Sequence, residues 1–567
     1  MEHKTQDSQR VLIIGLDGAT WDILDPWISD GSLPTLARLR QNGSWGDLRS
    51  TIPPITAPAW STFMTGKGPG KHGVFHFVPL LGEKTSEQGG PERVDARSIR
   101  SSTLWDILGH HSRKVGIINV PMTYPPRPVP GFMITGLLTP KGASNFTYPA
   151  ELSRELTDYI IDLDRFSDIQ PFQAARASEV TAPTLAMMKE FRDMLEIRAK
   201  TTLSLMDSNP WDVFMVVFTS TDRLGHYLWP YHRYPNSDDP PEVQELCRAV
   251  HEYYVRQDEV IGELVGRAGS DVTVIVISDH GMGPFSTHRI HLNNWLHQKG
   301  WLSVEAGGQR AFNPDGLLVR LGLPRDRFGR LIWQMPGLAK TRWVQKASRS
   351  RSMALDLNRS MAYGVPMYGS GNITGIRINL AGESKEALRQ EIAEGLRTIT
   401  DPETGRPVVQ WIHWGEDYYH GPYAESVPDI LVGADPDYEW GHQLGRYSSI
   451  ITKRSVFSGE GYHRLEGVFI ASGPLVVAQP EPLDNLNLAD IAPTVLYLTG
   501  LPVPSDMDGR VLTEIFSRGT VESRPVRVGE PLGYWPDASR ALYDEETISE
   551  EDEEQILARL RALGYLG

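Results

Sequence analysis

Four buried-strand patterns constrain this chain most, and the first of them is continuously apolar rather than alternating. That pattern is typical of strands covered on both faces of a sheet. The runs with their flanking residues span Arg10–Asp17, Lys114–Val120, Asp212–Phe218 and Val272–Ile277. Helical patterns separate them, at 32–40, 174–206 and 246–265. The alternation predicts an α/β fold with a doubly wound, mainly parallel sheet between layers of helices.

Polar residues follow three of these runs directly. Asp17 ends the first run, Asp222 follows the third, and Asp279 and His280 follow the fourth. Ligands of such sheets bind at the carboxyl ends of the strands. We therefore expect these four side chains to share one site.

Composition limits the function classes. The chain has 567 residues, 40% of them hydrophobic, a formal net charge of −15 and a single cysteine, Cys247. The acidic balance argues against binding to nucleic-acid polymers, which need a basic surface. One cysteine excludes a multi-cysteine metal site, so any metal is expected on histidines and carboxylates, which suits Zn, Mn, Mg or Fe. A bound cation would also reverse the local repulsion of an anionic substrate.

The sequence offers no apolar run of membrane-spanning length. The start of the chain, Met1–Arg10, is polar and lacks the apolar core and small-residue cleavage site of a secretory signal. We expect a cytoplasmic protein without a membrane span.

Three short motifs carry residues that could hold metals. Asp222 and His226 are four positions apart, which places them on one face of a helical turn. Asp279 and His280 precede Gly281, which gives the backbone freedom at a corner, and a glycine-rich loop carries His463. Each motif also has an ordinary interpretation: a capping Asp, a turn or a solvated His.

Jointly the motifs predict two metal sites. Asp222, His226 and His463 form a three-ligand set with an open position, as in catalytic zinc sites. The other set comprises Asp17, Asp279, His280 and the oxygen of Thr56. Two ions about 3.5–4 Å apart clamp the attacking and leaving oxygens of an in-line displacement at phosphorus.

Thr56 lies in the stretch Thr51–Gly66, which we expect to be a Thr/Pro-rich loop followed by a helix from Ser61. A threonine hydroxyl needs a base or a metal to act as a nucleophile. The alternative is that Thr56 is one turn hydroxyl among many.

The ordered motifs resemble the type I phosphodiesterase/nucleotide pyrophosphatase family of the alkaline phosphatase superfamily. They are Asp17-Gly, Thr56 before Pro58, Asp222-x-x-Gly-His226, Ser278-Asp279-His280-Gly-Met, Gly461-Tyr-His463, Asp490–Thr494 and Met507–Arg510. The resemblance covers about residues 10–515. It implies an alkaline-phosphatase-like fold and a two-metal hydrolase of phosphate esters, with zinc expected and Mn or Fe as alternatives.

The resemblance also implies roles for individual residues. It makes Thr56 the nucleophile, activated by the ion on Asp17, Asp279 and His280. The ion on Asp222, His226 and His463 binds the leaving group and then activates water.

Two departures from the family pattern concern the substrate. Nucleotide pyrophosphatases carry a phosphoryl-binding Asn some twenty residues after the nucleophile, where this chain has Phe77 after His76. Their loop typically reads Thr-Phe-Pro-Asn, against Thr56-Ala-Pro-Ala59 here. Any small-molecule phosphodiester, or a phosphomonoester, fits as well as a nucleotide.

Other activities stay open on the same motifs. A phosphomonoesterase, a phosphotransferase or mutase, and a non-enzymatic binding protein on a phosphatase scaffold are the alternatives. A sulfatase is disfavoured, because Cys247 does not lie in the motif that matures to formylglycine. The sequence does not indicate the oligomeric state.

The expected domain plan has an N-terminal arm at 1–9, a catalytic domain at 10–520 and an acidic tail with a short helix at 521–567. A basic region rich in Trp and Met predicts an inserted cap at about 300–370. Further strands are expected at 375–380, 429–432 and 467–471, with helices at 384–398 and 490–498, the latter capped by Asp490.

Overall fold

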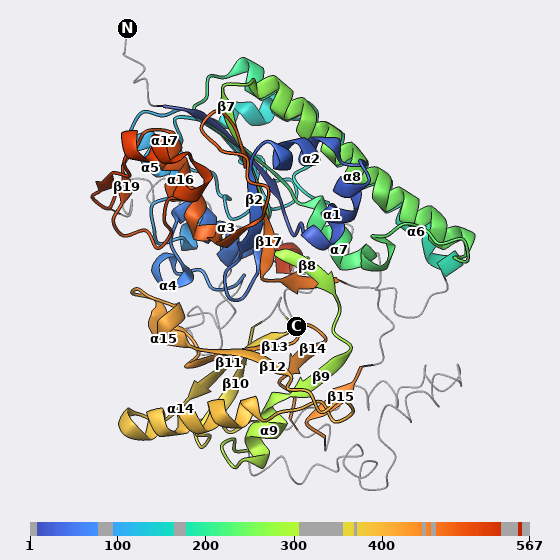
Figure 1. The fold of residues 1–567 in the computed structure, drawn as a ribbon, viewed down its shortest axis with the longest axis vertical. Helices are drawn as coiled ribbons and strands as arrows, with labels where there is room; N and C mark the ends of the chain where they lie inside the picture. Colours follow the sequence, from blue (N-terminus) through green and yellow to red (C-terminus); the bar gives the residue numbers. More distant parts are fainter. Residues whose placement is uncertain are drawn as a thin grey trace. The chain divides into compact units, whose positions relative to one another are not determined.

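The computed structural model describes residues 8–77, 94–163, 177–304, 355–367, 371–444, 449–454, 461–533 and 554–557 (Figure 1). The chain divides into two compact units. The first comprises Met1–Pro284, Tyr419–Glu425 and Phe457–Gly567, and the second Phe285–Tyr418 and Ser426–Val456. Most of the predicted cap, most of the N-terminal arm and most of the acidic tail lie outside the described residues.

A nine-stranded sheet forms the centre of the first unit, in the order β18-β2-β17-β7-β1-β6-β3-β4-β5. Strands β7, β1, β6, β3 and β4 are parallel, and the antiparallel strand β17 joins β7 to β2. The strands are β1 (Arg10–Leu16), β2 (Ser44–Arg49), β3 (Val115–Val120), β4 (Gly131–Thr135), β5 (Thr147–Tyr148), β6 (Val213–Phe218), β7 (Val272–Ile277), β17 (Glu466–Ser472) and β18 (Leu483–Asn487). The predicted α/β class with a mainly parallel sheet is confirmed.

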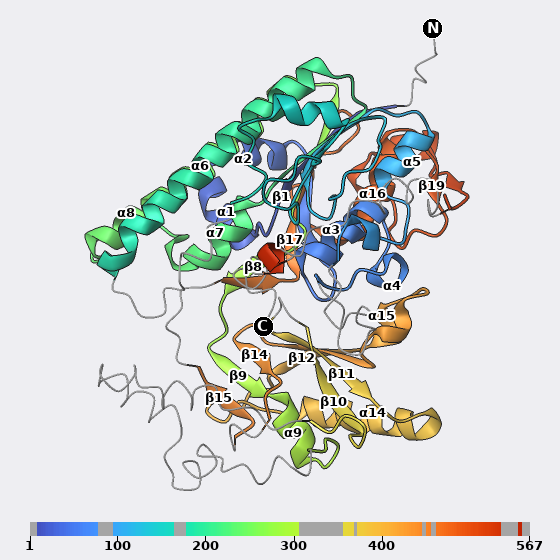
Figure 2. The ribbon, with the colours of Figure 1, turned by 180° about the vertical axis from the view of Figure 1, so that it is seen from behind.

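Helices cover both faces of this sheet, as Figures 1 and 2 show from opposite sides. One face carries α1 (Trp21–Ser29), α2 (Pro34–Gln41), α6 (Ala177–Ser208) and α8 (Pro241–Ala268). The other carries α3 (Thr56–Thr65), α5 (Leu104–His110) and α16 (Ile491–Leu498). Since both faces are covered, every residue of β3, β6 and β7 is buried, which explains why their sequences are predominantly apolar.

The register of the sheet aligns the strand ends that carry the candidate ligands. Gly15 pairs with Val217 on one side and with Ile277 on the other, and Leu16 pairs with Phe218. The residues after β1, β6 and β7 therefore leave the sheet at the same edge.

The prediction of a loop around Thr56 is wrong, because α3 begins at Thr56 itself and ends at Thr65. Pro58 does not prevent this, since an N–H in the first turn has no partner within the helix. Gly66, with a φ of 66°, ends the helix in the left-handed region. All ten residues of the helix are buried.

Asp490 occupies the predicted N-cap position of α16, but its side chain bonds elsewhere. Its carboxylate accepts hydrogen bonds from the N–H groups of Asn487 at 3.0 Å and Arg510 at 2.8 Å, and it makes no cap bond to α16. The side chain therefore joins the Met507–Arg510 segment to the start of α16.

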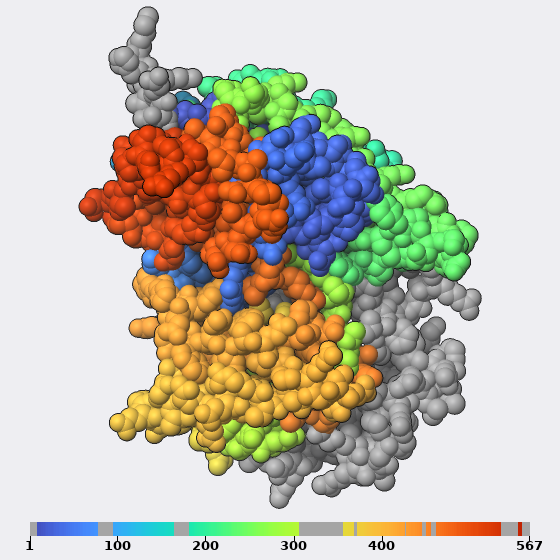
Figure 3. All heavy atoms as spheres, viewed as in Figure 1, coloured from blue at the N-terminus to red at the C-terminus, as the bar shows by residue number. Residues whose placement is uncertain are grey.

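The second unit has its own apolar core and two sheets. A four-stranded antiparallel sheet has the order β10-β11-β13-β12, and a three-stranded sheet has the order β14-β9-β15. These strands are β9 (His288–His291), β10 (Ala362–Pro366), β11 (Ile373–Ile378), β12 (Val409–Trp414), β13 (Ile430–Ala434), β14 (Tyr438–Gly441) and β15 (Ile451–Lys453). Helix α14 (Gly382–Arg397) buries Leu388, Ile392 and Leu396 and turns its other face to solvent (Figure 3).

Within the described ranges, no helix is both long enough and apolar enough to cross a bilayer.

Candidate metal centre

Helix α7 (Ser220–Leu228) supplies the first two candidate ligands. Asp222 Oδ1 lies 3.3 Å from His226 Nε2 one turn later on the helix. The same oxygen lies 3.2 Å from Nε2 of His463, on β16 (Gly461–Arg464), which pairs with β8 (Gly281–Pro284). One ligand atom from each residue falls within 4.8 Å of the others. The fold thus brings His463 against a helical pair that lies more than 230 positions earlier in the sequence.

A second group meets at the ends of β1 and β7. His280 Nε2 lies 3.7 Å from Asp17 Oδ1 and 3.9 Å from Asp222 Oδ1. Asp17, Asp222 and His280 also fall within 4.8 Å of one another by their ligand atoms. Asp279 Oδ2 lies 3.4 Å from His280 Nε2. Asp222 therefore belongs to both groups.

Hydrogen bonds fix the three imidazoles so that each Nε2 is a lone-pair donor to a cation. Nδ1 of His226 faces the Gly461 carbonyl at 3.2 Å, and that of His280 faces the Gly281 carbonyl at 3.0 Å. Nδ1 of His463 faces the Pro54 carbonyl at 2.8 Å. A carbonyl oxygen can only accept, so Nδ1 carries a proton, and in the neutral ring Nε2 is then the atom with the free lone pair. Metal-ligating histidines are held in this way.

Several atoms of the cluster have the chemistry of cation ligands. Nε2 of His226 and Nε2 of His463 lie 2.9 Å apart, although both nitrogens are acceptors in this tautomer. Asp17 Oδ1, Asp279 Oδ2 and His280 Nε2 are buried, and no protein group hydrogen-bonds to them. Buried polar atoms in this state are rare and call for an ion or a water. The residues present therefore fit divalent metal ions.

The pKa shifts of these residues are consistent with binding of divalent cations. Burial, followed by repulsion from Asp279 and Asp222, raises the pKa of Asp17 well above its usual value. Burial and the charge of Asp222 raise the pKa of Asp279 in the same way. Burial opposes ionisation of Asp222, yet His226, His463 and Arg223 together hold its pKa well below normal. Burial lowers the pKa of His463 to about 3, so its ring is neutral at pH 7. Bound cations would relieve the repulsion among the carboxylates.

Two contacts attach the start of α3 to this cluster. Pro54, two residues before Thr56, carries the carbonyl that faces His463 Nδ1. Trp60, one turn after Thr56, donates its indole N–H to Asp17 Oδ2 at 3.1 Å. Thr56 itself is 1% exposed. The helix that begins with the predicted nucleophile is thereby held against both ligand groups.

Comparison with known proteins identifies the family. The family model described as type I phosphodiesterase/nucleotide pyrophosphatase matches residues 11–330. The chain belongs to the type I phosphodiesterase/nucleotide pyrophosphatase family. Membership supports hydrolysis of phosphate esters, and members of this family use divalent metals. No curated protein sequence matches the chain significantly.

Solved structures are similar in fold. Phosphonoacetate hydrolase from Sinorhizobium meliloti, in complex with phosphonoformate, is 15% identical with a TM-score of 0.50, covering 85% of this chain and 94% of its own. Human ectonucleotide pyrophosphatase/phosphodiesterase 5 is 14% identical with a TM-score of 0.44, covering 91% and 99% respectively. Its murine counterpart, inactive and in complex with AMP, is 13% identical with a TM-score of 0.45, covering 90% and 100%. The fold is that of alkaline-phosphatase-like hydrolases.

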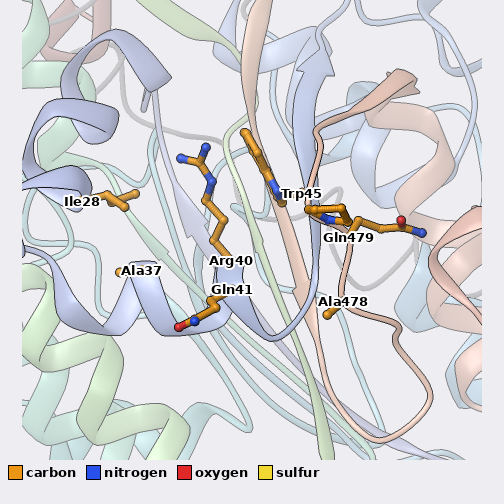
Figure 4. Close-up of a pocket in the computed structure, with 8 residues that line it drawn as sticks. Ile28, Ala37, Arg40, Gln41, Trp45, Ala478 and Gln479 are labelled. Atoms are coloured by element: carbon orange, nitrogen blue, oxygen red, sulfur yellow. The ribbon is translucent and has the colours of Figure 1, made fainter.

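A surface pocket of about 550 Å³ lies apart from the candidate ligands of this family member (Figure 4). Its lining includes Arg40, Trp45 and Gln479. The Arg40 guanidinium stacks on Trp45 at 3.3 Å from the ring centre and forms an ion pair with Asp25. The positive charge of Arg40 is therefore already paired within the protein. None of the candidate metal ligands lines the pocket.

Sequence reasoning missed four residues that support the candidate metal ligands. Trp60, Arg223 and Asp162 contact the candidate ligands or their partners, and Gly18 donates its N–H to Asp279 Oδ1 at 3.2 Å. Arg223 sits inside the Asp222–His226 motif and could have been suspected. Asp162 has no local signal, because its partner lies 61 positions away.

Gly18→Ala should weaken metal binding and lower stability. Gly18 has a φ of 68°, and an alanine Cβ there would lie 3.0 Å from Cα and Cβ of Asp222. The left-handed conformation alone costs about 1–2 kcal/mol for a non-glycine residue. The contact would in addition push Asp17 and Asp222 apart. The thermal midpoint and the metal content per chain measure the two effects.

Gly31→Ala is the matched control, because Gly31 has a φ of 87° and open space around its Cβ position. This variant should lower the thermal midpoint through backbone strain, but its metal content per chain should stay unchanged. Equal metal content in the two variants would show that the close approach to Asp222 does not matter.

Proposed function

We propose that this protein hydrolyses phosphodiesters with Thr56 as the nucleophile and two divalent metal ions as cofactors. The observation that carries the proposal is the meeting of buried carboxylates with three imidazoles whose Nε2 atoms face inward. Zinc is the ion we propose, since mixed His and Asp ligands suit it. A cytoplasmic location remains a prediction.

The two ligand groups suggest which residues would hold the ions. Asp17, Asp279 and His280, with the Thr56 oxygen, would hold one, and Asp222, His226 and His463 would hold the other. When bound, the ions would supply charge to the phosphoryl oxygens and acidify the attacking hydroxyl and later a water molecule. Asp222 Oδ1 lies 3.2 Å from His463 Nε2 and 3.9 Å from His280 Nε2, so this carboxylate would fix the spacing between the two ions.

The chain's own contribution is positioning. Because α3 begins at Thr56, the N–H groups at its start, such as that of Ala57, have no partner within the helix and would be available to bind a phosphoryl group at Thr56. The Thr56 oxygen would attack phosphorus while the leaving alkoxide departs on the opposite side. Water would then cleave the phospho-threonyl intermediate and restore the hydroxyl. Burial of the site strengthens each electrostatic interaction during these steps.

A phosphomonoesterase is the second candidate, since the residues that distinguish nucleotide pyrophosphatases are absent from the chain. Phe77 occupies the position where nucleotide pyrophosphatases carry a phosphoryl-binding Asn, and its side chain is fully buried in the main core. Ala59, in place of the loop Asn, is also fully buried. Neither position offers the phosphate donor of a nucleotide pyrophosphatase, so a nucleotide is not the favoured substrate.

A substrate panel tests the proposal. Protein stripped by a chelator and reloaded with Zn²⁺ is assayed with an aryl phosphodiester, an aryl phosphomonoester, an aryl sulfate and a dinucleotide. We expect the diester to give the highest kcat/KM, the sulfate to give none, and the stripped protein to be inactive until metal is restored. Faster turnover of the monoester would favour the second candidate. Full activity of the stripped protein would contradict both.

A further inference from the structure

Arg223, inside the ligand motif, lies between two buried carboxylates. One guanidinium nitrogen donates to Asp222 Oδ2 at 2.5 Å, and another donates to Asp162 Oδ2 at 3.1 Å. The side chain of Arg223 is 2% exposed and those of both aspartates are fully buried. Since ions are costly to bury without partners, the three side chains form one unit.

The two carboxylate oxygens of Asp222 have different partners. Oδ2 accepts the bond from Arg223, while Oδ1 faces the Nε2 atoms of His463 at 3.2 Å and His226 at 3.3 Å. The two arms of the planar guanidinium bond one carboxylate each and so fix Oδ2 of Asp222 relative to Asp162, a geometry that a lysine ammonium does not provide. Arg223 therefore determines which oxygen of Asp222 is presented to an ion.

Asp162 balances the charge of Arg223. An unpaired guanidinium next to Asp222 would repel cations from the centre, and the Asp162 carboxylate neutralises it. The segment before Asp162 is itself fixed. The carbonyl of Ile161 accepts hydrogen bonds from Arg198 at 2.7 Å and from Asn119 Nδ2 at 2.6 Å. Asn119 lies within β3, one residue before its end, in a left-handed conformation with a φ of 60°.

From this arrangement we infer that Asp162 and Arg223 are positioning residues that set the metal affinity of the centre through Asp222. The inference rests on the proposed function, because it assumes that Asp222 binds metal. Hydrogen bonds to ligating carboxylates typically change metal affinity about 10- to 100-fold when they are removed.

Zinc affinity, rather than turnover, tests this inference. Metal-free protein is titrated with Zn²⁺ against a chromophoric chelator, for the wild type, Asp162→Asn, Arg223→Lys and Arg223→Met. We expect each variant to bind Zn²⁺ about 10- to 100-fold more weakly. Arg223→Lys keeps the charge and guards against a failure of the Met variant to fold. Unchanged affinity in Asp162→Asn and Arg223→Lys would overturn the inference.

Two further variants distinguish a positioning role of Asp162 and Arg223 from a purely structural role. Combining Arg223→Met with Asp162→Asn removes both buried charges, so the thermal midpoint of the metal-free protein should recover while the affinity stays low. Asp258→Asn is the matched control, since Asp258 is also a buried carboxylate but accepts bonds from the backbone N–H groups of Thr35 and Leu36. It should lower the thermal midpoint and leave the affinity unchanged.

The outcomes distinguish this inference from the proposed function. Recovery of wild-type affinity together with stability in the double variant would show a merely structural role. A wild-type protein that binds no Zn²⁺ would overturn both proposals, whereas unchanged variants of a zinc-binding wild type would overturn only this one.

Discussion

Asp222→Asn is expected to remove both metal ions and to lower turnover of bis(p-nitrophenyl) phosphate by roughly 1,000-fold or more. Asp222 is the one residue shared by the two ligand groups. The substitution removes its negative charge, and an amide nitrogen in place of Oδ1 would face imidazole nitrogens at 3.2 and 3.3 Å without the capacity to bind a cation. Elemental analysis of the purified variant and its kcat measure the two effects.

His226→Ala is the comparison for this variant. His226 belongs to only one of the two groups, so its removal should release about one ion per chain and leave the other. If Asp222→Asn kept two ions per chain, the assignment of Asp222 to the centre would be wrong. Circular dichroism should show that both variants are folded.

Thr56→Ala is expected to abolish turnover of the same diester, with a loss of about 1,000-fold or more, while most of the bound metal remains. The three carboxylates and three imidazoles stay in place, and only the attacking oxygen is lost. Helix α3 should persist, because Ile55 rather than Thr56 occupies its N-cap position and alanine favours helices. Kinetics and metal content on the same sample measure the result.

Ser61→Ala is a matched control on the same helix. Ser61 is fully buried, and its hydroxyl donates to the carbonyl of Ala57 at 2.7 Å. It should retain most of the activity, because this hydroxyl is engaged within the helix. Undiminished turnover in Thr56→Ala would exclude Thr56 as the nucleophile and leave a directly attacking water as the mechanism.

Local patterns predicted much of the fold. The runs before Asp17, Asp222 and Asp279 became the parallel strands β1, β6 and β7 within a residue or two, because burial on both faces demands continuous apolar sequence. The four-residue spacing of Asp222 and His226 likewise corresponded to one helical turn. The start of α3 was predicted five residues too late, since Pro58 suggested a loop although a first turn tolerates proline.

The sequence by itself determined the class of the sheet, the edge at which its ligands gather and the residue types that can bind a cation there. These follow from periodicity and from the side chains themselves. Only the tertiary structure decided that Asp222 is shared between two groups, that Gly18 must approach it, and that Asp162 balances Arg223. Such contacts join residues up to hundreds of positions apart, and no local pattern encodes a distance across the fold.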